Sequence, residues 1–585
     1  MAGQTGRSRP PQPRTDKPRT DKPRTDKPRT DKPRTGQPDG GQPRTGQPRT
    51  DKPRTGQPNG GQPRTGQSRS RPPQGGRPRV DPARRAAYDV LRAVADRDAY
   101  ANLLLPALLR ERGLTGRDAA FATELTYGTL RGRGTYDAIL AACSDRDDLA
   151  PPVRDVLRLG AHQLLATRVG SHAAVATSVD LAKDVCGPRP SGFVNAVLRR
   201  VATRDLQAWI DIVAPDRSQD PAGYLAVRHS YPRWIVEAFG DALGAASPTK
   251  TDTETDTETD TETDSETENA LAAGNLRPDV VLAVRTAGPP DAASLGAPGE
   301  RTRWSPYGFR LAGGDPAPLV ASGQAAVQDE ASQLAALALT RVGLTGQDSL
   351  WLDLCAGPGG KATLLAHLAA KRGARLVASD VRPHRASRVL KALRRASRTP
   401  DHGHDTADRD APNHHAPNHE TPDREAPDRD AVLVADGRRI PWRSGVFDRV
   451  LADVPCSGLG SLRRRPEARW RKTPEGVEGL AILQRELLNA AIDSVRPGGV
   501  VAYVTCSPHL AETRQIVTSV ADDRGDITIL DAPAVLAEVP DLRGPDPKDP
   551  KDPKDPKNPK YSRFAQFWPH RHGTDAIFLA LLRRE

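Results

Sequence analysis

Hydrophobic positions in the first third of the chain repeat with the period of an α-helix. From Ala87 to Val94, apolar residues follow the i, i+3, i+4, i+7 spacing of a helix with one buried face. Similar stripes recur at 103–109, 121–130, 153–165, 175–185 and 193–201. Gly113, Gly134 and Gly187 are expected to punctuate these helices. The pattern therefore predicts a compact all-helical domain over residues 83–202.

From residue 349 onward, short apolar runs alternate with helical stretches. We predict strands at 350–354, 375–379, 431–435, 449–452 and 499–505. Strands that alternate with helices are typical of a doubly wound α/β sheet. We therefore expect residues 346–585 to form an α/β domain of this kind.

The segment between these two parts, 203–345, mixes both patterns. A short helix is predicted from Tyr231, a strand at 280–284 and a helix at 325–339. We expect a linker and a small α+β subdomain that lead into the α/β domain.

Low-complexity stretches interrupt the chain at 1–82, 247–268, 397–430 and 543–560. The first repeats Thr-Asp-Lys-Pro-Arg and Thr-Gly-Gln-Pro-Arg, so proline blocks regular structure and little apolar surface is available for burial. We expect a disordered tail there, and a surface loop in the Thr/Asp/Glu repeat at 251–268. Residues 397–430 and 543–560 are expected to be insertions in the α/β domain. Histidines of the former follow an Ala-Pro-Asn-His repeat, and no metal site is expected.

The composition narrows the class of protein. Lys and Arg number 86 against 74 Asp and Glu, a net charge of +12 that fits a polyanionic partner. The five cysteines are odd in number and form no Cys-x-x-Cys pair, so we expect reduced thiols in the cytoplasm. No apolar run has the length of a membrane span, and no apolar segment marks a signal peptide. Membrane proteins and small secreted domains are thereby excluded, and a monomer is the default expectation.

The sharpest chemical signal is the run Asp353-Leu-Cys-Ala-Gly-Pro-Gly-Gly-Lys361, which follows an apolar strand and begins a helix. Glycines let the backbone approach a ligand, and the N–H groups of a helix start favour electronegative atoms. Asp380 ends the next strand, 20 residues after Gly360, where a carboxylate suits a ribose diol. No GxxxxGK[ST] motif is present. These residues favour a nucleoside cofactor, although a purely structural strand–helix turn is the alternative.

Further polar residues and two thiols follow later strands. Asp436 closes one strand, Asp453 and Cys456 follow the next, and Cys506 follows the one after. In an open α/β sheet such residues gather at the carboxyl ends of the strands, where ligands bind. A cysteine is often only a small buried hydrophobe. Two thiols at corresponding strand ends beside a nucleoside site favour a chemical role instead.

In combination, DLCAGPGGK, the Asp380 strand end, ADG, DVPCSGLG and VTCS resemble the RNA cytosine-C5 methyltransferases that use S-adenosyl-L-methionine. The helical segments at 127–131, 159–164 and 193–199 resemble the NusB-type RNA-binding domain. A NusB-like domain followed by a methyltransferase domain is similar to the RsmB (Sun/Fmu) family of ribosomal RNA methyltransferases. The resemblance covers most of residues 83–585 outside the insertions.

The resemblance implies a role for each candidate residue. A thiolate adds to C6 of cytosine, which makes C5 nucleophilic toward the methyl sulfonium. Cys506 is the implied nucleophile, Cys456 assists release of the product, and Asp453 contacts the ring. The residues implied to line the cofactor pocket are Cys355, Ala356, Gly357, Pro358, Gly359, Gly360, Lys361 and Asp453, with Asp380 on the ribose and Asp436 by the adenine.

Three features qualify this assignment. DNA cytosine methyltransferases carry their nucleophile in a Pro-Cys pair, which would point to Cys456, but their Glu-Asn-Val motif is absent and Cys506 is favoured. Amino-group methyltransferases have an aromatic residue after (D/N)PP, where Cys456 stands, so N-methylation is disfavoured. Glu512 resembles an acidic position of the family, whereas Thr513 departs from the expected Asn.

A basic run follows the Cys456 motif and comprises Arg463, Arg464, Arg465, Arg469, Arg471 and Lys472, with Trp470 among them. Such a run suits RNA phosphates with an aromatic ring for stacking. A solvated surface loop is the equal alternative.

The predicted function is methylation of a cytosine in small-subunit (16S) ribosomal RNA, with the target base taken out of any stack. The same chemistry on transfer RNA is an alternative. A second alternative is an RNA-binding module for assembly or antitermination, in which methyl transfer is incidental.

Overall fold

The computed structural model describes residues 80–146, 148–244, 257–285, 289–397, 430–543 and 561–585. Side chains of residues 257–264 and 561 lie outside this description. Nearly all of the expected disordered tail, the histidines of the 397–430 insertion and most of 543–560 also lie outside it.

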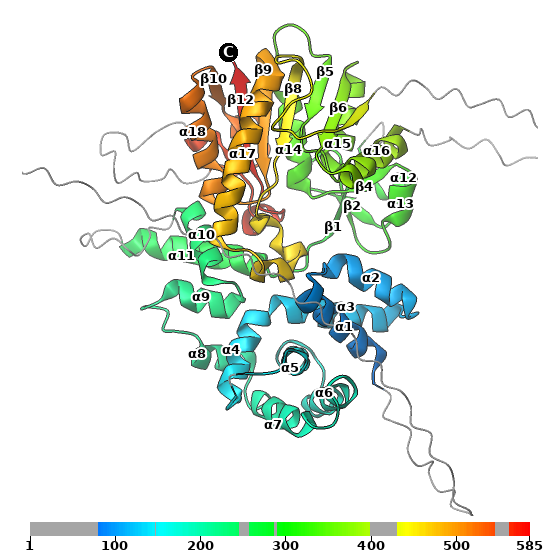
Figure 1. Cartoon of the computed structure of the whole chain (residues 1–585), viewed down its shortest axis with the longest axis vertical. Helices are drawn as coiled ribbons and strands as arrows, with labels where there is room; N and C mark the ends of the chain where they lie inside the picture. The colour runs from blue at the N-terminus through cyan, green and yellow to red at the C-terminus, as the bar shows by residue number, and fades with distance from the viewer. Residues whose placement is uncertain (1–79, 147, 245–256, 286–288, 398–429, 544–560) are drawn as a thin grey trace, which may run out of the picture. The chain divides into compact units, whose positions relative to one another are not determined.

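The N-terminal part is all-helical, as predicted (Figure 1). Its helices are α1 (Pro82–Arg97), α2 (Ala101–Glu111), α3 (Gly116–Arg131), α4 (Arg133–Cys143), α5 (Pro151–Ala166), α6 (Ser171–Cys186) and α7 (Ser191–Val201). The Asp81 side chain accepts the Arg84 N–H at the start of α1, and Pro82 occupies the first helical position. The stripe from Ala87 to Val94 is buried in a core shared by α1 to α7.

Gly134 was expected to punctuate the helices; the break itself falls at Gly132, between α3 and α4, and Gly134 follows it. It lies in the first turn of α4, a helix that the stripes did not predict. A Cβ atom on Gly134 would lie 2.6 Å from the Trp470 ring. The glycine therefore serves close packing between distant segments, which no local pattern reports.

The next part combines helices with a small antiparallel sheet of order β2-β3-β1-β4. The helices are α8 (Leu206–Val213), α9 (Pro221–His229), α10 (Arg233–Leu243), α11 (Thr257–Ala273), α12 (Ala292–Leu295) and α13 (Ala317–Ala321). The strands are β1 (Val280–Val284), β2 (Gly299–Arg301), β3 (Gly308–Leu311) and β4 (Ala325–Val327). This confirms the α+β subdomain and the strand at 280–284. The helix predicted at 325–339 begins later, as α14 (Glu330–Arg341), because residues 325–327 pair with β1.

The expected surface loop at 251–268 is also wrong for its described residues. Helix α11 covers residues 257–273, and Ala270 and Leu271 are buried against α10. Glu266 and Glu268 form ion pairs with Arg571 and Arg228. The described part of the polar repeat is therefore helical, because it continues into the helix whose residues Ala270 and Leu271 are buried.

The main sheet has the order β10-β12-β9-β8-β5-β6-β7, with β11 beside β12. Its strands are β5 (Leu350–Asp353), β6 (Arg375–Asp380), β7 (Ala431–Val434), β8 (Phe447–Asp453), β9 (Val495–Thr505), β10 (Ile527–Leu530), β11 (Ala565–Gln566) and β12 (Phe578–Arg584). Strands β5 to β9 are parallel and match the five predicted strands. Strand β12 is antiparallel to β9 and β10, an edge that the sequence did not predict.

Helices cover both faces of this sheet, which confirms the doubly wound architecture (Figure 1). Helices α14, α15 (Gly360–Lys371) and α16 (Pro383–Ser397) pack in one core, and α17 (Pro474–Ser494) and α18 (Arg514–Arg524) pack in the other. Along β9, Ala502 and Val504 face the first core while Val501 and Tyr503 face the second. Short helices complete the domain: α19 (Ala532–Val535), α20 (Pro569–His572), η1 (Leu459–Arg464), η2 (Pro466–Trp470), η3 (Leu510–Glu512) and η4 (Tyr561–Arg563).

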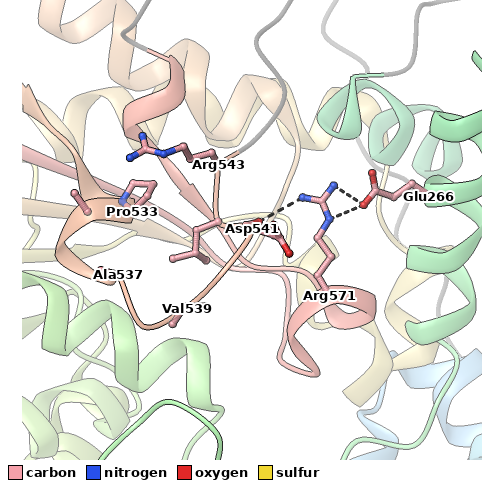
Figure 2. A pocket seen from close by; sticks show the side chains of 9 residues that line it. Glu266, Pro533, Ala537, Val539, Asp541, Arg543 and Arg571 are labelled. Atoms are coloured by element: carbon pink, nitrogen blue, oxygen red, sulfur yellow. Dashed lines mark hydrogen bonds and ion pairs between the residues drawn. The ribbon is translucent and has the colours of Figure 1, made fainter. Parts of the chain in front are cut away.

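A cavity of about 740 Å³ lies beside α19 and α20 (Figure 2). Arg571 reaches across it to Glu266, to which its Nε donates at 2.5 Å. Val539, Asp541 and Arg543 also line it. None of the predicted site residues lines this cavity, so it is separate from the predicted site.

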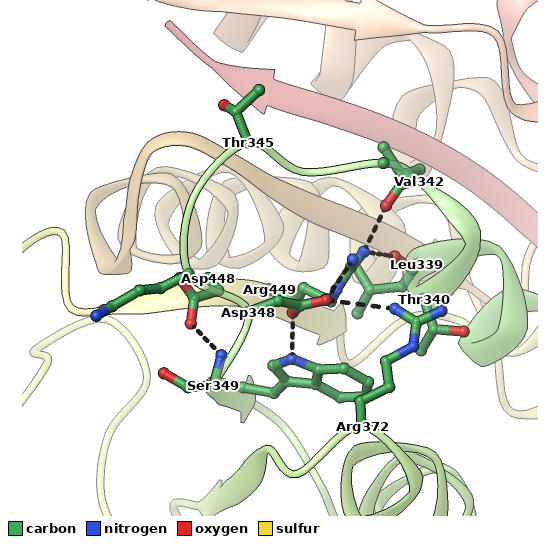
Figure 3. A network of polar contacts seen from close by, with 12 residues as sticks. Leu339, Thr340, Val342, Thr345, Asp348, Ser349, Arg372, Asp448 and Arg449 are labelled. Atoms are coloured by element: carbon green, nitrogen blue, oxygen red, sulfur yellow. Dashed lines mark hydrogen bonds and ion pairs between the residues drawn. The ribbon is translucent and has the colours of Figure 1, made fainter.

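A buried arginine ties α14 to the sheet (Figure 3). Arg449 of β8 is 2% exposed, and it donates to both oxygens of Asp348 at 2.8 and 2.9 Å. It also donates to the carbonyls of Leu339 and Val342, at the end of α14. These bonds satisfy a charge that burial would otherwise penalise. They hold the amino ends of β5 and β8, opposite the strand ends that carry the predicted chemistry.

Candidate active site

The parallel register brings the predicted residues to one edge of the sheet. Asp353 pairs with Leu451 of β8 and Ala378 of β6, and Asp453 pairs with Val504 of β9. The strands that end at Asp353, Asp380, Asp453 and Thr505 therefore finish side by side. This edge is where open α/β sheets bind ligands.

The glycine-rich turn after β5 lies directly against Asp380. The Gly357 N–H donates to Asp380 Oδ2 at 3.1 Å, and the Arg382 N–H donates to Oδ1 at 2.8 Å. A Cβ atom on Gly357 would stand 2.3 Å from Asp380 Oδ2, so only glycine permits this approach. Gly359 has a φ of 114°, which favours glycine, and α15 begins at the next residue.

Three other residues of the predicted cofactor run, Cys355, Ala356 and Pro358, differ in how far they are buried. Ala356 is buried in the core on one side of the sheet, and Cys355 packs against the core on the other side. Pro358 is exposed. The turn therefore offers a ligand mainly its backbone. Burial raises the pKa of Cys355 well above its ordinary value.

Asp436 lies two residues beyond β7 and is engaged by a neighbour. Arg438 donates to both of its carboxylate oxygens, with a shortest distance of 2.8 Å. These hydrogen bonds lower the pKa of Asp436. A ligand that uses this carboxylate would share it with Arg438.

Lys361 points from the start of α15 toward Asp453, and their charged atoms lie 2.9 Å apart. Burial alone would lower the pKa of Lys361, but the Asp453 carboxylate raises it above its ordinary value. A fixed ammonium–carboxylate pair therefore stands at the ends of β5 and β8.

The thiols of Cys456 and Cys506, both predicted site residues, are in contact. Cys456 Sγ and Cys506 Sγ are 3.2 Å apart and partly exposed. The hydrogen bond between the two thiols lowers the pKa of Cys506, and the Lys361 charge acts in the same direction. The pKa of Cys456 is raised well above its ordinary value by the same hydrogen bond, by burial and by the nearby Glu512. The pair therefore favours a thiolate at Cys506 and a thiol at Cys456.

A buried carboxylate that sequence reasoning left without a role holds the two thiol turns together. Glu512 is fully buried and accepts from the Ser457 N–H at 2.7 Å and the Ser457 hydroxyl at 2.5 Å. Gln484 Nε2 donates to Glu512 at 3.0 Å and to the Pro455 carbonyl at 2.9 Å. The Ser457 and Ser507 hydroxyl oxygens are 3.1 Å apart. The residue after each cysteine thus belongs to one network.

Asp353, the first residue of the glycine-rich run, is enclosed at the end of β5. It is fully buried, and burial raises its pKa to about 8 with a further contribution from the Asp453 charge. At neutral pH it is therefore largely uncharged, which keeps one negative charge away from the thiol pair.

In the basic run after Cys456, Arg463 and Arg469 are buried, Arg464, Trp470, Arg471 and Lys472 are half-buried, and Arg465 is exposed. The expectation of a solvated surface loop therefore fails for its two buried arginines. Arg463 and Arg464 each bind Asp329 and Asp575, at 2.5 to 3.0 Å. The main chain of Gly460, in the same segment, donates to the Cys506 carbonyl at 2.9 Å. These arginines therefore anchor the segment that follows the thiol, and they are not available to RNA phosphates.

The rest of the basic run joins the α/β domain to the helical parts. Arg469 is fully buried, donates to the Tyr231 hydroxyl at 2.9 Å and lies 3.7 Å from that ring's centre. Arg471 donates to the carbonyls of Val94 and Ala99. A local pattern of charges could not reveal these partners, because they lie more than 200 residues away in the chain.

Within the described residues, no group of His, Cys, Asp or Glu is arranged to hold a metal ion. The histidine repeat at 397–430 lies outside those residues, so the structure does not test the metal expectation there. No described helix has the length and apolar character of a membrane span.

Comparisons with known proteins agree with this organisation. A model of the family described as "16S rRNA methyltransferase RsmB/F" matches residues 343–413 and 420–583, and a NusB family model matches 81–203. "Putative methyltransferase Rv1407" of Mycobacterium tuberculosis (strain H37Rv) is 47% identical over 515 residues, covering 86% of this chain and 97% of the relative. Ribosomal RNA small subunit methyltransferase B of Pseudomonas putida is 31% identical, covering 74% and 87%. The crystal structure of PH0851 has the same fold, with a TM-score of 0.61 at 21% identity over 86% of this chain and 99% of that one.

Proposed function

Because the chain belongs to the 16S rRNA methyltransferase RsmB/F family, we propose that it methylates C5 of a cytosine in 16S ribosomal RNA. It is an RNA methyltransferase, and its cofactor is S-adenosyl-L-methionine. The observation that carries the proposal is the contact between the Cys456 and Cys506 thiols beside the Lys361–Asp453 pair. Two thiols at this place suit covalent catalysis on a pyrimidine.

The crevice residues fit this cofactor. Gly357 and Gly359 allow the backbone to come close to a ligand, and Asp380 is fixed by two N–H groups in a position to accept from the ribose hydroxyls. Asp436 is proposed to lie by the adenine. When bound, the cofactor supplies an electrophilic methyl group.

In the proposed reaction, the Cys506 thiolate forms a bond to C6 of the cytosine. The addition makes the ring an enamine-like species in which C5 is the nucleophile. C5 would take the methyl group as the bond between that methyl and the sulfonium sulfur breaks, which leaves S-adenosyl-L-homocysteine. Loss of the C5 proton restores the double bond and breaks the bond between C6 and Cys506. The thiolate is thereby regenerated, and one difficult step is divided into easier ones.

The neighbours of Cys506 support each step. The two thiols lie within hydrogen-bond distance, and in the proposed reaction the Cys456 S–H donates to Cys506 and stabilises the thiolate before attack. Asp453 is proposed to contact the ring edge, and Lys361, 2.9 Å from it, offsets negative charge in the adduct. Cys456 is proposed to assist the elimination that frees the product. This division of labour supports Cys506 rather than Cys456 as the nucleophile.

The family description and the relatives' names support 16S ribosomal RNA as substrate. The experiment is bisulfite sequencing of total RNA from a strain that lacks the gene and carries either the wild-type chain or Cys506→Ser. We expect one 16S cytosine to be protected by the wild type and unprotected with the variant. Protection of a transfer RNA cytosine instead would contradict the substrate, and protection by the variant would contradict the nucleophile.

A further inference from the structure

Among the described residues, one buried side-chain amide beside the glycine-rich turn has no hydrogen-bond partner. Gln328 lies between β4 and α14 and is 7% exposed. Neither its Oε1 nor its Nε2 has a hydrogen-bond partner among the described residues. Its backbone is fully used, because its N–H donates to Val281 and its carbonyl accepts from Gln333. Buried polar side chains are normally paired, so an unpaired one calls for a ligand or a cost in stability.

The amide is held against the first turn of α15. Its side-chain carbonyl carbon lies 3.9 Å from the place of a Cβ atom on Gly360. The next residue, Asp329, is fixed by Arg463, Arg464 and the Asp575 N–H. The main chain of Gln328 therefore cannot move away from the turn without breaking a buried ion network.

The chemistry of this place favours one end of the cofactor. The first turn of a 12-residue helix presents N–H groups without helical partners, and its dipole favours a carboxylate. A primary amide adds two donors and one acceptor. The amino-acid end of S-adenosyl-L-methionine has a carboxylate that accepts and an ammonium that donates, and an amide matches both.

We infer that Gln328 binds the amino-acid end of S-adenosyl-L-methionine, with Nε2 donating to the carboxylate and Oε1 accepting from the ammonium. This inference rests on the proposed placement of the cofactor at residues 357–361. It is independent of which base is methylated.

The test compares two ligands on the full-length protein by isothermal titration calorimetry. S-adenosylhomocysteine keeps the amino-acid end, whereas 5′-methylthioadenosine lacks it. We expect Gln328→Leu to weaken binding of S-adenosylhomocysteine on the order of 10- to 100-fold, since the lost bonds involve charged groups. Binding of 5′-methylthioadenosine should change by less than about twofold. Gln347→Leu, at an exposed position, is the matched control and should change neither affinity.

A second readout separates a ligand residue from a structural one. Leucine removes an unpaired buried amide, so Gln328→Leu should raise the melting temperature of the ligand-free protein while it weakens binding. A structural role predicts a lower melting temperature and an equal loss for both ligands, which would overturn the inference. Unchanged affinity of Gln328→Leu for S-adenosylhomocysteine would also overturn the inference. If this variant then bound RNA more weakly, the amide would contact the target base instead of the cofactor. The comparison needs no RNA, so it decides this assignment whether or not 16S RNA is the substrate.

Discussion

Cys456 Sγ lies 3.2 Å from Cys506 Sγ, although 50 residues separate the two in the chain. The turns after β8 and β9 carry them, and the parallel pairing of these strands brings the turns together. Glu512 holds Ser457, the residue after Cys456, by two hydrogen bonds and so helps to maintain the distance between the two sulfur atoms. The proposed chemistry depends on this spacing, because one sulfur must attack while the other assists release.

Replacement of Cys456 by serine should trap an intermediate. If Cys456 assists elimination, Cys456→Ser retains attack by Cys506 but releases product slowly. A covalent protein–RNA complex that survives denaturing gel electrophoresis should then accumulate. The Cys456→Ser/Cys506→Ser double variant is the control and should form none. Rapid turnover by the single variant without a complex would contradict the release role.

Alkylation should show the lowered pKa of Cys506. The rate of reaction with iodoacetamide follows the thiolate fraction, so it should reach its plateau at lower pH for Cys506 than for an ordinary thiol. Cys456→Ala removes the donated hydrogen bond and should shift the Cys506 inflection to higher pH. Mass spectrometry of the peptides measures each site separately. An unshifted inflection in Cys456→Ala would contradict the described hydrogen bond.

Oxidation should report the spacing that Glu512 maintains. Hydrogen peroxide oxidises two thiols to a disulfide and is reduced to water, and a disulfide bond of about 2.05 Å needs only a small approach from the observed spacing. We expect rapid loss of both thiols in the wild type and recovery with dithiothreitol. Glu512→Gln disrupts the Ser457 bonds, so cross-linking and kcat should both fall about tenfold or more while the KM for cofactor changes little.

Glu478→Gln, at an exposed position on α17, is the matched charge control for that experiment. It should cross-link at the wild-type rate. A Glu512→Gln variant that cross-links and turns over normally would contradict a positioning role.

Arg469 should matter for stability rather than for RNA affinity. Arg469→Ala leaves buried carbonyls and the Tyr231 hydroxyl without their donor, so the free energy of unfolding should fall by about 3 kcal/mol or more. Arg465→Ala, at an exposed position, should cost less than about 0.5 kcal/mol. Urea denaturation checks both values. A stable Arg469→Ala variant with a smaller salt dependence of RNA binding would restore the phosphate-contact interpretation.

Asp353 should make stability fall as pH rises through neutrality. Its pKa is about 8 in the folded state and about 4 in an unfolded chain, so the folded state binds more protons between these values. The contribution of Asp353 to the free energy of unfolding of the ligand-free protein therefore falls as the pH rises from about 4 to about 8. Asp353→Asn copies the neutral acid and should be more stable than the wild type at pH 8, by a few kcal/mol at most. Equal stabilities at pH 8 would show that burial does not raise this pKa.

The parallel core of the α/β domain was predictable because its information is local. The five parallel strands are short apolar runs, and those that end at Asp353, Asp380 and Asp453 stop at a carboxylate. The topology rule for open sheets then placed the thiols together. The position of strand β12 was not predictable in this way, because β12 is antiparallel to β9 and β10 and so falls outside the alternation of strand and helix that predicts a parallel sheet.

Two of the differences share one cause, which is tertiary packing of a polar or glycine residue. From the sequence, Arg469 is expected to be a solvated cation, but in the structure it packs against Tyr231. Gly134 is expected to mark a break, but it lies close to the Trp470 ring. Glu512 has no periodic or motif signal of its own beyond its place after Cys506. Its role depends on Ser457, which the sheet alone brings near.

The central claim is that Cys506 bonds to C6 of the target cytosine. A 16S RNA fragment with 5-fluorocytosine at the target position tests it directly, because fluorine at C5 prevents the proton loss that ends the reaction. With S-adenosyl-L-methionine present, peptide mass spectrometry should find the RNA base attached to Cys506 in the wild type. Attachment to Cys456, or methyl transfer with no adduct on either cysteine, would contradict the account.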